Sequence, residues 1–328
     1  MDVRFIVDGT VKEHETDDLA ELMRRDDGFA WIDVPELTDD HEAVLEDLIG
    51  LHPMALNSCR ERNHVPTIHG YADHTFIVVH SPLAGDAGHV HLLELDVVIG
   101  DRFLVTVHGP LNPVVPVDAA LVETRGTLAR IEAGRFQPRS PAEVAYAVLS
   151  GVARRQRGVI GEVAERIPGL EKRVMEGDFR DPESLLEELF LLRHELMTVR
   201  TMSAQEHDIF QRMSNLGDRV VPAEDVHFSH DLADQFERVR SIADGECQFL
   251  FGVIELYQTR VTTKLTVAME RLAVIAAVTL PVTAIASIYG MNVIVNSSTH
   301  WTQLIIVLLA MCVISGLLLR WAHKQGWW

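Results

Sequence analysis

The stretch SIYGMNVIVN, residues 287–296, lies between two long apolar segments near the C-terminal end of a 328-residue, acidic chain. It carries no formal charge, and it contains a glycine, Gly290, at which the chain can turn sharply. It also presents two amide side chains, Asn292 and Asn296. Soluble domains rarely end in this way, so the role of the stretch depends on the segments on either side.

Both flanking segments are long enough to cross a membrane. Residues 272–289 and 301–319 contain no charged side chain, and a helix of about 20 apolar residues spans the hydrocarbon core of a bilayer. Buried helices of soluble proteins seldom lack every charge over such a length. We therefore expect two transmembrane helices that are joined by a short extracytoplasmic loop, residues 290–300.

Basic residues flank the outer ends of this hairpin, at Arg260, Lys264 and Arg271 before it and at Arg320 and Lys324 after it. The connecting loop has no charge at all. The positive-inside rule then predicts a multi-pass protein of the cell membrane, with the N-terminus and a short basic tail, residues 320–328, in the cytoplasm. The first residues show no basic run followed by an apolar run, so no signal peptide is expected.

The remainder of the chain is strongly acidic. Two of the 29 basic residues and none of the 48 acidic residues lie after Arg271, so residues 1–271 carry a formal net charge of −21. Such a surface repels nucleic acid and attracts cations. The three cysteines, Cys59, Cys247 and Cys312, are too far apart for a disulfide framework, which fits a reducing compartment.

Residues 1–117 are expected to form an α/β domain. Thr38 precedes an amphipathic helical pattern over residues 38–52, with two aspartates that complement the helix dipole. Runs rich in β-branched and aromatic residues predict short strands of one modest sheet, at residues 3–11, 29–34, 74–80, 92–100 and 102–109.

Residues 118–271 are expected to be helical and to form a stalk. A capping box at residues 140–143 predicts a helix to about Glu176, and Asp181 predicts the start of a second helix that ends near Gly217. A third helix is expected from Pro222 through the first span. The expected chain is thus an α/β cytosolic domain, a long helical stalk and two C-terminal transmembrane helices.

Two helices per chain cannot enclose a polar path, so transport through this hairpin requires an oligomer. One face of the first span carries residues at three- or four-residue steps, namely Thr266, Met269, Leu272, Ala273, Ala276, Leu280, Thr283 and Ser287. These residues are candidates for the lining of a pore. The alternative is that the small residues pack helices together and that the hydroxyls bond back to their own helix.

The motif YGMN, residues 289–292, closes the first span, and a short loop, a second span and a basic tail follow it. In this position the motif resembles the Gly-Met-Asn signature of the CorA family of divalent-cation transporters. Residues 269–292, MERLAVIAAVTLPVTAIASIYGMN, resemble the pore helix of that family, and the order of the predicted domains is similar over the whole chain.

The resemblance implies a funnel-shaped homopentamer in which the first span lines a central pore. It implies uptake of Mg²⁺, or of Co²⁺, driven by the membrane potential, with no enzymatic activity and no organic cofactor. The implied selectivity filter is Gly290, Met291 and Asn292. Thr266 then corresponds to the inner mouth of the pore and Thr283 to a second polar ring, and an apolar constriction is implied at Met269, Leu272 and Leu280.

The same resemblance implies regulation by cytosolic Mg²⁺, which binds between subunits and holds the pore closed. Asp231 corresponds to a sensing carboxylate of the family, Asp234 is a further candidate, and Asp86 is the candidate partner from the α/β domain. The alternative is that these aspartates are ordinary solvated acids.

Two further interpretations remain open. The loop VIVNSSTH, residues 293–300, lacks the acidic residue that many CorA proteins carry there. The chain also contains 16 histidines, including a pair at His89 and His91. These features suit a zinc transporter that resembles the ZntB branch of the superfamily, with proton coupling as an option. A membrane-tethered enzyme or sensor is the third interpretation, although the sequence carries no recognisable catalytic motif.

Overall fold

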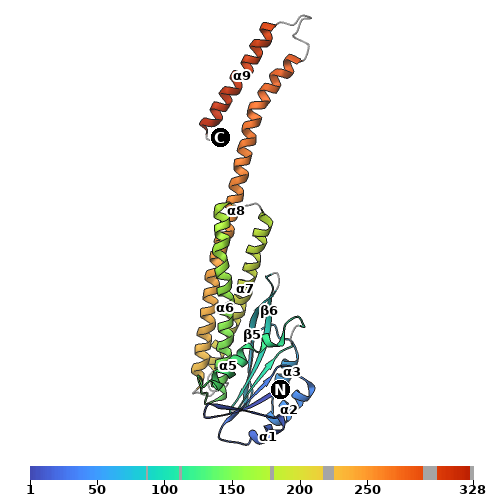
Figure 1. Cartoon of the computed structure of the whole chain (residues 1–328), viewed down its shortest axis with the longest axis vertical. Helices are drawn as coiled ribbons and strands as arrows, with labels where there is room; N and C mark the ends of the chain where they lie inside the picture. Colours follow the sequence, from blue (N-terminus) through green and yellow to red (C-terminus); the bar gives the residue numbers. More distant parts are fainter. Residues whose placement is uncertain (86–87, 111–112, 178–180, 217–224, 291–300, 326–328) are drawn as a thin grey trace. The chain divides into compact units, whose positions relative to one another are not determined.

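The computed structural model describes residues 1–85, 88–110, 113–177, 181–216, 225–290 and 301–325 (Figure 1). The chain divides into two compact units. The first unit comprises Met1–Arg173 and Asp178–Gly252, and the second comprises Val174–Gly177 and Val253–Trp328.

A seven-stranded mixed sheet, with strand order β2-β1-β3-β7-β6-β5-β4, organises the first unit. Strands β3 and β7 pair in parallel, and the other neighbouring strands are antiparallel. The strands are β1 (Asp2–Val7), β2 (Thr10–His14), β3 (Phe29–Val34), β4 (Thr67–Gly70), β5 (His74–Ala84), β6 (Val90–Gly100) and β7 (Phe103–His108). The sheet thus has two strands more than the five runs predicted from the sequence, namely β2 and β4.

One of these two additional strands comes from the run at residues 3–11, which folds as a hairpin rather than as one strand. Asp8 and Gly9 both have positive φ angles, 47° and 72°. A two-residue turn of this kind matches the twist of two antiparallel strands, and Asp-Gly is a favoured sequence for it. The turn brings Val7 opposite Thr10 in the β1–β2 ladder.

Short helices cover one face of the sheet, with α1 at Leu19–Leu22, α2 at Asp39–Val44 and α3 at Pro53–Arg60. The predicted helix over residues 38–52 is confirmed as α2 and a single π-turn (Leu45–Ile49), and Thr38 caps it by accepting a hydrogen bond from the His41 N–H at 3.3 Å. Apolar residues of this face and of these helices form one buried core, which includes Phe5, Ile32 and Val105.

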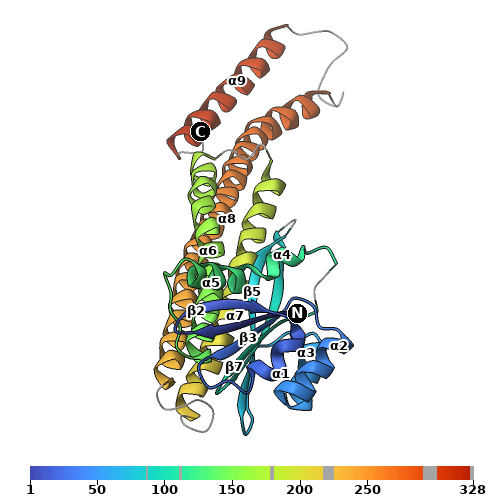
Figure 2. The same ribbon diagram turned by 60° about the horizontal axis from the view of Figure 1, so that its bottom comes forward.

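Longer helices cover the other face of the sheet, as Figure 2 shows. They are α5 (Val122–Glu132), α6 (Pro141–Glu176) and α7 (Pro182–Leu216), and the short helix α4 (Val117–Ala120) precedes them. Both predicted helix starts are confirmed. Ser140 accepts from the Glu143 N–H at 3.2 Å, and Asp181 accepts from the Ser184 N–H at 3.1 Å.

Helix α8 (Val226–Gly290) joins the stalk to the first span without a break, and α9 (Trp301–Lys324) forms the second span. Gly245 and Gly252 do not interrupt α8. Both helices contain segments apolar enough to cross a membrane, with mean hydropathies of 2.1 and 2.5. The second span is longer than its apolar core because Arg320 to Lys324 continue the helix.

Candidate functional site

The C-terminal half of α8 presents the predicted pore-lining residues on one exposed face. With successive residues 100° apart, all eight positions fall within an arc of about 120°. Every one of them is exposed, and Met269 and Leu280 each keep 67% of their accessible surface. No residue that the structure describes covers this face of α8.

The opposite face of α8 is less exposed. Val274 retains only 8% of its surface, and Val278, Pro281 and Ile285 are half-buried. These positions follow one another at three- or four-residue steps and are centred on the side of the helix away from the predicted pore-lining face. The chain itself thus covers one side of its first span and leaves the other side open.

Two hydroxyls of this exposed face bond back to their own helix. Thr266 donates to the Thr262 carbonyl at 3.0 Å, and Thr283 donates to the Thr279 carbonyl at 2.8 Å. This was the alternative to a pore-lining role, but the two roles are compatible. Each hydroxyl oxygen that donates its hydrogen keeps lone pairs with which it can accept a hydrogen bond from water.

Gly290 is the last residue of α8. Met291 and Asn292, which complete the predicted filter, lie outside the described residues. The predicted filter therefore follows the exposed face of α8 in the sequence and stays a prediction.

Asp231, the predicted sensing carboxylate, lies near the N-terminal end of α8 and is tied to its own subunit. Its Oδ2 accepts from the Tyr146 hydroxyl at 2.5 Å and from Gln235 Nε2 at 2.6 Å. Gln235 Nε2 also lies 3.1 Å from Ser150 Oγ. The hydrogen bonds from Tyr146 and Gln235 lower the pKa of Asp231, so this carboxylate is ionised at neutral pH.

The other predicted regulatory residues do not join it in the described chain. Asp234 is exposed on α8, and Asp86 lies outside the described residues. Within the ranges that the structure describes, no group of three or more histidine, cysteine, aspartate or glutamate side chains is arranged to hold a metal ion. One copy of the chain thus does not gather the predicted regulatory site from its described residues.

The histidine pair predicted from the sequence is confirmed as a contact. His89 precedes β6 and His91 lies within it, and their rings meet edge to face with centroids 4.7 Å apart. Two imidazoles fall short of the three protein ligands that a catalytic or structural zinc site commonly has. The pair alone does not distinguish a zinc protein.

A buried polar network at the edge of β5 was not anticipated. Strand β4 pairs with β5 only as far as Val78, so the backbone of His80 lies beyond the end of that ladder. Glu206 of α7 accepts from the His80 N–H at 2.9 Å, and Gln156 of α6 donates to the His80 carbonyl at 3.1 Å. Two side chains thus replace the missing strand.

The position of Glu206 explains why sequence reasoning missed it. It lies in a polar part of α7, AQEHD, where a glutamate usually faces water. In the structure it is fully buried, and burial raises its pKa to about 8. Only knowledge of where β4 ends would have predicted a buried acceptor at this point.

The comparisons with known proteins bear on the whole chain. The family described as CorA-like Mg²⁺ transporter protein matches residues 26–324. The chain belongs to this family. As a CorA-family protein it is a membrane protein that transports divalent metal ions. CorA-family proteins are transporters and not enzymes, as the sequence led us to expect.

Relatives of this CorA-family chain match it over nearly its full length. YfjQ of Bacillus subtilis is 23% identical over 306 residues, which cover 92% of this chain and 91% of the relative. The cobalt/magnesium transport protein CorA of Thermotoga maritima is 20% identical over 325 residues, which cover 96% and 89%.

Solved structures show that the CorA fold extends over the whole chain. The CorA magnesium transporter of Methanocaldococcus jannaschii matches with a TM-score of 0.81 at 16% identity, over 100% of this chain and 99% of that one. The cytoplasmic domain of ZntB from Vibrio parahaemolyticus matches with a TM-score of 0.57 at 11% identity, over 80% of this chain and 98% of that one. The ZntB structure contains the cytoplasmic domain alone, which accounts for part of the difference between the two scores.

Proposed function

We propose that this CorA-family protein is a homopentameric Mg²⁺ uptake channel whose pore is lined by α8. The observation that carries the proposal is the fully exposed face of α8 in the membrane-spanning segment. Polar hydroxyls on a transmembrane helix are expensive in lipid and are expected to face protein or water. Neighbouring copies around a central axis would place Thr283 and Ser287 beside water.

The signature at the end of α8 supports Mg²⁺ as the transported ion, with Co²⁺ as a second substrate. Mg²⁺ loses its water reluctantly and is usually bound through it. A ring of Asn292 amide oxygens accepts hydrogen bonds from a hydrated ion without removing that water. Thr283 would form a second ring of acceptors below it, and Met269, Leu272 and Leu280 would form an apolar constriction that closes the pore by dewetting.

The membrane potential would drive the ion inward. It is worth about 2.3 kcal/mol per charge per 100 mV, and roughly twice that for a divalent cation. The basic residues that flank the hairpin orient both termini toward the cytoplasm. On this basis we assign residues 1–117 and 118–271 to the cytosol, 272–289 and 301–319 to the membrane, 290–300 to the outside and 320–328 to the cytosolic tail.

Regulation by cytosolic Mg²⁺ is the second part of the proposal. Asp231 is held ionised by Tyr146 and Gln235, and Asp234 is exposed three residues further along α8. A divalent ion between these carboxylates and Asp86 of a neighbouring copy would offset their repulsion and hold the pore closed. Loss of the ion would let the copies separate and the pore fill with water.

Flux into liposomes tests the proposal. Wild-type protein and an Asn292→Ala variant are compared for Mg²⁺, Co²⁺ and Zn²⁺, with and without a membrane potential and a pH gradient, and Asn296→Ala serves as a matched control in the same loop. We expect potential-driven Mg²⁺ entry that is lost in Asn292→Ala and kept in Asn296→Ala. Zinc flux that follows the pH gradient would instead favour a ZntB-like transporter, and no flux of any ion would contradict a channel.

A further inference from the structure

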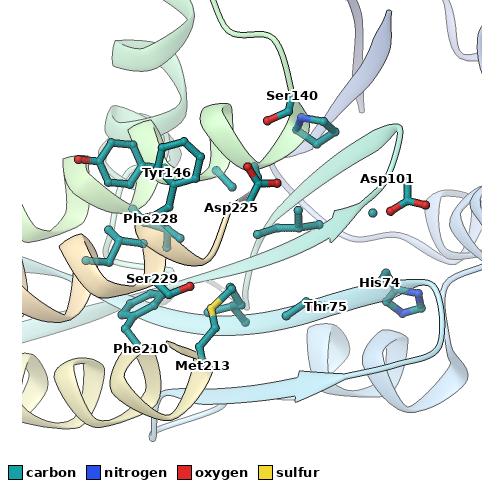
Figure 3. Close-up of a pocket in the computed structure, with 18 of the residues that line it drawn as sticks. His74, Thr75, Asp101, Ser140, Tyr146, Phe210, Met213, Asp225, Phe228 and Ser229 are labelled. Atoms are coloured by element: carbon teal, nitrogen blue, oxygen red, sulfur yellow. The ribbon is translucent and has the colours of Figure 1, made fainter. Parts of the chain in front are cut away.

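A cavity of about 420 Å³ lies in the first unit, where one end of the sheet meets the start of α6, the end of α7 and the start of α8 (Figure 3). It is separate from the predicted pore-lining face and large enough for a small organic molecule. Buried apolar side chains form about half of its walls, with Ile77 from the sheet, Leu149 from α6, Phe210 from α7 and Leu232 from α8, and polar groups line the rest.

An aromatic pair forms one side of this cavity. Tyr146 and Phe228 stack with ring centroids 4.8 Å apart, and Figure 3 shows them beside each other. The faces of aromatic rings attract cations as well as apolar chains. This wall therefore suits a ligand that combines methylene groups with positive charge.

The charged residues around the cavity have one sign. Asp73, Asp101 and Asp225 line it, and no lysine or arginine does so among the described residues. Asp73 interacts with His74 Nδ1 at 2.7 Å. Asp101 and Asp225 lie on different sides of the cavity in Figure 3. This electrostatic environment disfavours an anionic ligand and matches a cation with separated charges.

One buried hydroxyl also points into this space. Ser229 is 1% exposed, and its Oγ has no hydrogen-bond partner among the described residues. Figure 3 shows the hydroxyl directed toward the interior of the cavity. An unsatisfied buried polar group is costly, so a ligand that supplies its partner binds more tightly.

We propose that this cavity binds an aliphatic polyamine. The methylene chain lies along the apolar and aromatic walls, the ammonium groups pair with Asp101 and Asp225, and Ser229 Oγ accepts an N–H hydrogen bond. A hydrated Mg²⁺ ion fits less well, because its waters need acceptors on all sides and the apolar part of the wall, which includes Ile77, Phe210 and Leu232, offers none. The proposal goes beyond ion transport and does not depend on it, since polyamine binding is measured on purified protein in the absence of ion flux.

Isothermal titration of the purified full-length protein with spermidine tests this site. We expect saturable binding that Ser229→Ala weakens about tenfold, since a hydrogen bond to a charged group is lost. Asp101→Asn removes an exposed charge pair, so we expect a smaller loss of about threefold. Ala142→Leu, on the first turn of α6 beside the cavity, should weaken binding by filling the space.

An acidic chain also binds polyamines nonspecifically, so the control is Asp47→Asn, which removes one exposed charge outside the cavity and should leave the affinity unchanged. Circular dichroism checks that each variant is folded. Asp101→Asn changes an exposed residue, so it is expected to fold and can test the site even if a variant at a buried position does not fold. Three results would overturn the proposal. Spermidine could show no saturable binding, or the Asp47→Asn control could weaken binding as much as the cavity variants do. Mg²⁺ could also bind in place of spermidine, with an affinity that the cavity variants reduce.

Discussion

Single buried residues connect the sheet of this protein to its long helices. His80 lies on β5 beyond the end of β4, and its backbone groups are paired by Glu206 and Gln156 instead of by a strand. Because unpaired backbone groups in a buried position are costly, these two side chains fix α6 and α7 against the sheet edge. Burial raises the pKa of the Glu206 carboxyl to about 8, so the protonation of this group affects the arrangement.

Glu206→Gln should make stability less dependent on pH. The folded-state pKa of Glu206, about 8, is raised above its ordinary value of 4.5 by burial. Its contribution is therefore fully present below pH 4.5 and is lost as the pH rises to about 8, which amounts to a few kcal/mol. We expect the apparent Tm of the variant to fall less between pH 5 and pH 8 than that of the wild type.

The matched control for this experiment is Glu187→Gln, an exposed glutamate on the same helix. It should leave the pH profile of the wild type unchanged. Parallel profiles for the Glu206 variant and the wild type would show that Glu206 is ionised in the folded protein and would contradict the prediction.

Tyr146→Phe should remove the hydroxyl that donates to Asp231 while keeping the ring stacked on Phe228. We expect a loss of about 1–2 kcal/mol at pH 7, toward the low end for a hydrogen bond to a charged group, because Asp231 is only half-buried. The pKa of Asp231 is lowered by this bond, so the stabilisation is present above the ordinary pKa of an aspartate and is lost as the pH falls through the lowered value.

Thermal unfolding of both proteins between pH 2 and pH 7 measures this effect. The difference in apparent Tm should shrink toward low pH, where a protonated Asp231 no longer accepts a charge-assisted bond. A difference that stays constant with pH would mean that the hydroxyl acts by packing alone.

At the scale of elements, side chains fix the starts of the long helices. Ser140 accepts from the Glu143 N–H, and Glu143 accepts in turn from the Arg139 N–H at 2.9 Å. The reciprocal bond thus reaches one residue further back than in the usual capping box, whose glutamate accepts from the cap residue itself. Pro141 lies at the first helical position, where its missing N–H costs nothing.

Ser140→Ala should destabilise the protein by about 1 kcal/mol, because it leaves a backbone N–H of α6 without its acceptor. Urea unfolding followed by circular dichroism measures the change. Ser184→Ala on α7 is the control, since the cap there is the side chain of Asp181, and we expect it to change stability by less than about 0.5 kcal/mol. Equal losses in both variants would contradict a capping role for Ser140.

At the scale of the whole molecule, the exposed stripe on the first span fits the proposed pentamer. In the proposed pentamer, Leu280 would face the central axis and Ile285 would face away from it, because they lie on opposite sides of α8. In one copy of the chain, Leu280 keeps 67% of its accessible surface and Ile285 is half-buried.

Cysteine cross-linking in membranes tests this arrangement. In a Cys312→Ser background, which removes the exposed native thiol, Leu280→Cys should form disulfide-linked dimers on mild oxidation, since its copies would meet near the axis. Ile285→Cys is the matched control and should stay largely monomeric on denaturing gels. Equal cross-linking at both positions, or none at either, would contradict a pore lined by this face.

The sequence by itself determined the membrane hairpin, the helix starts and the family. An uncharged run of about 20 residues has few other stable environments than a bilayer, and capping residues act within a few positions of the helix end that they define. The motif at residues 289–292 was informative because it stands between two such runs. These are local properties, so one-dimensional patterns contain them.

Only the tertiary structure decided which polar residues are buried and what they contact. Glu206 and His80 are 126 positions apart, and Asp231 and Tyr146 are 85 apart. Their roles depend on where a strand ends and on how helices from distant parts of the chain meet, since burial and pairing are properties of packing. The cavity beside Ser229 has the same origin, because its walls come from one end of the sheet and three separate helices.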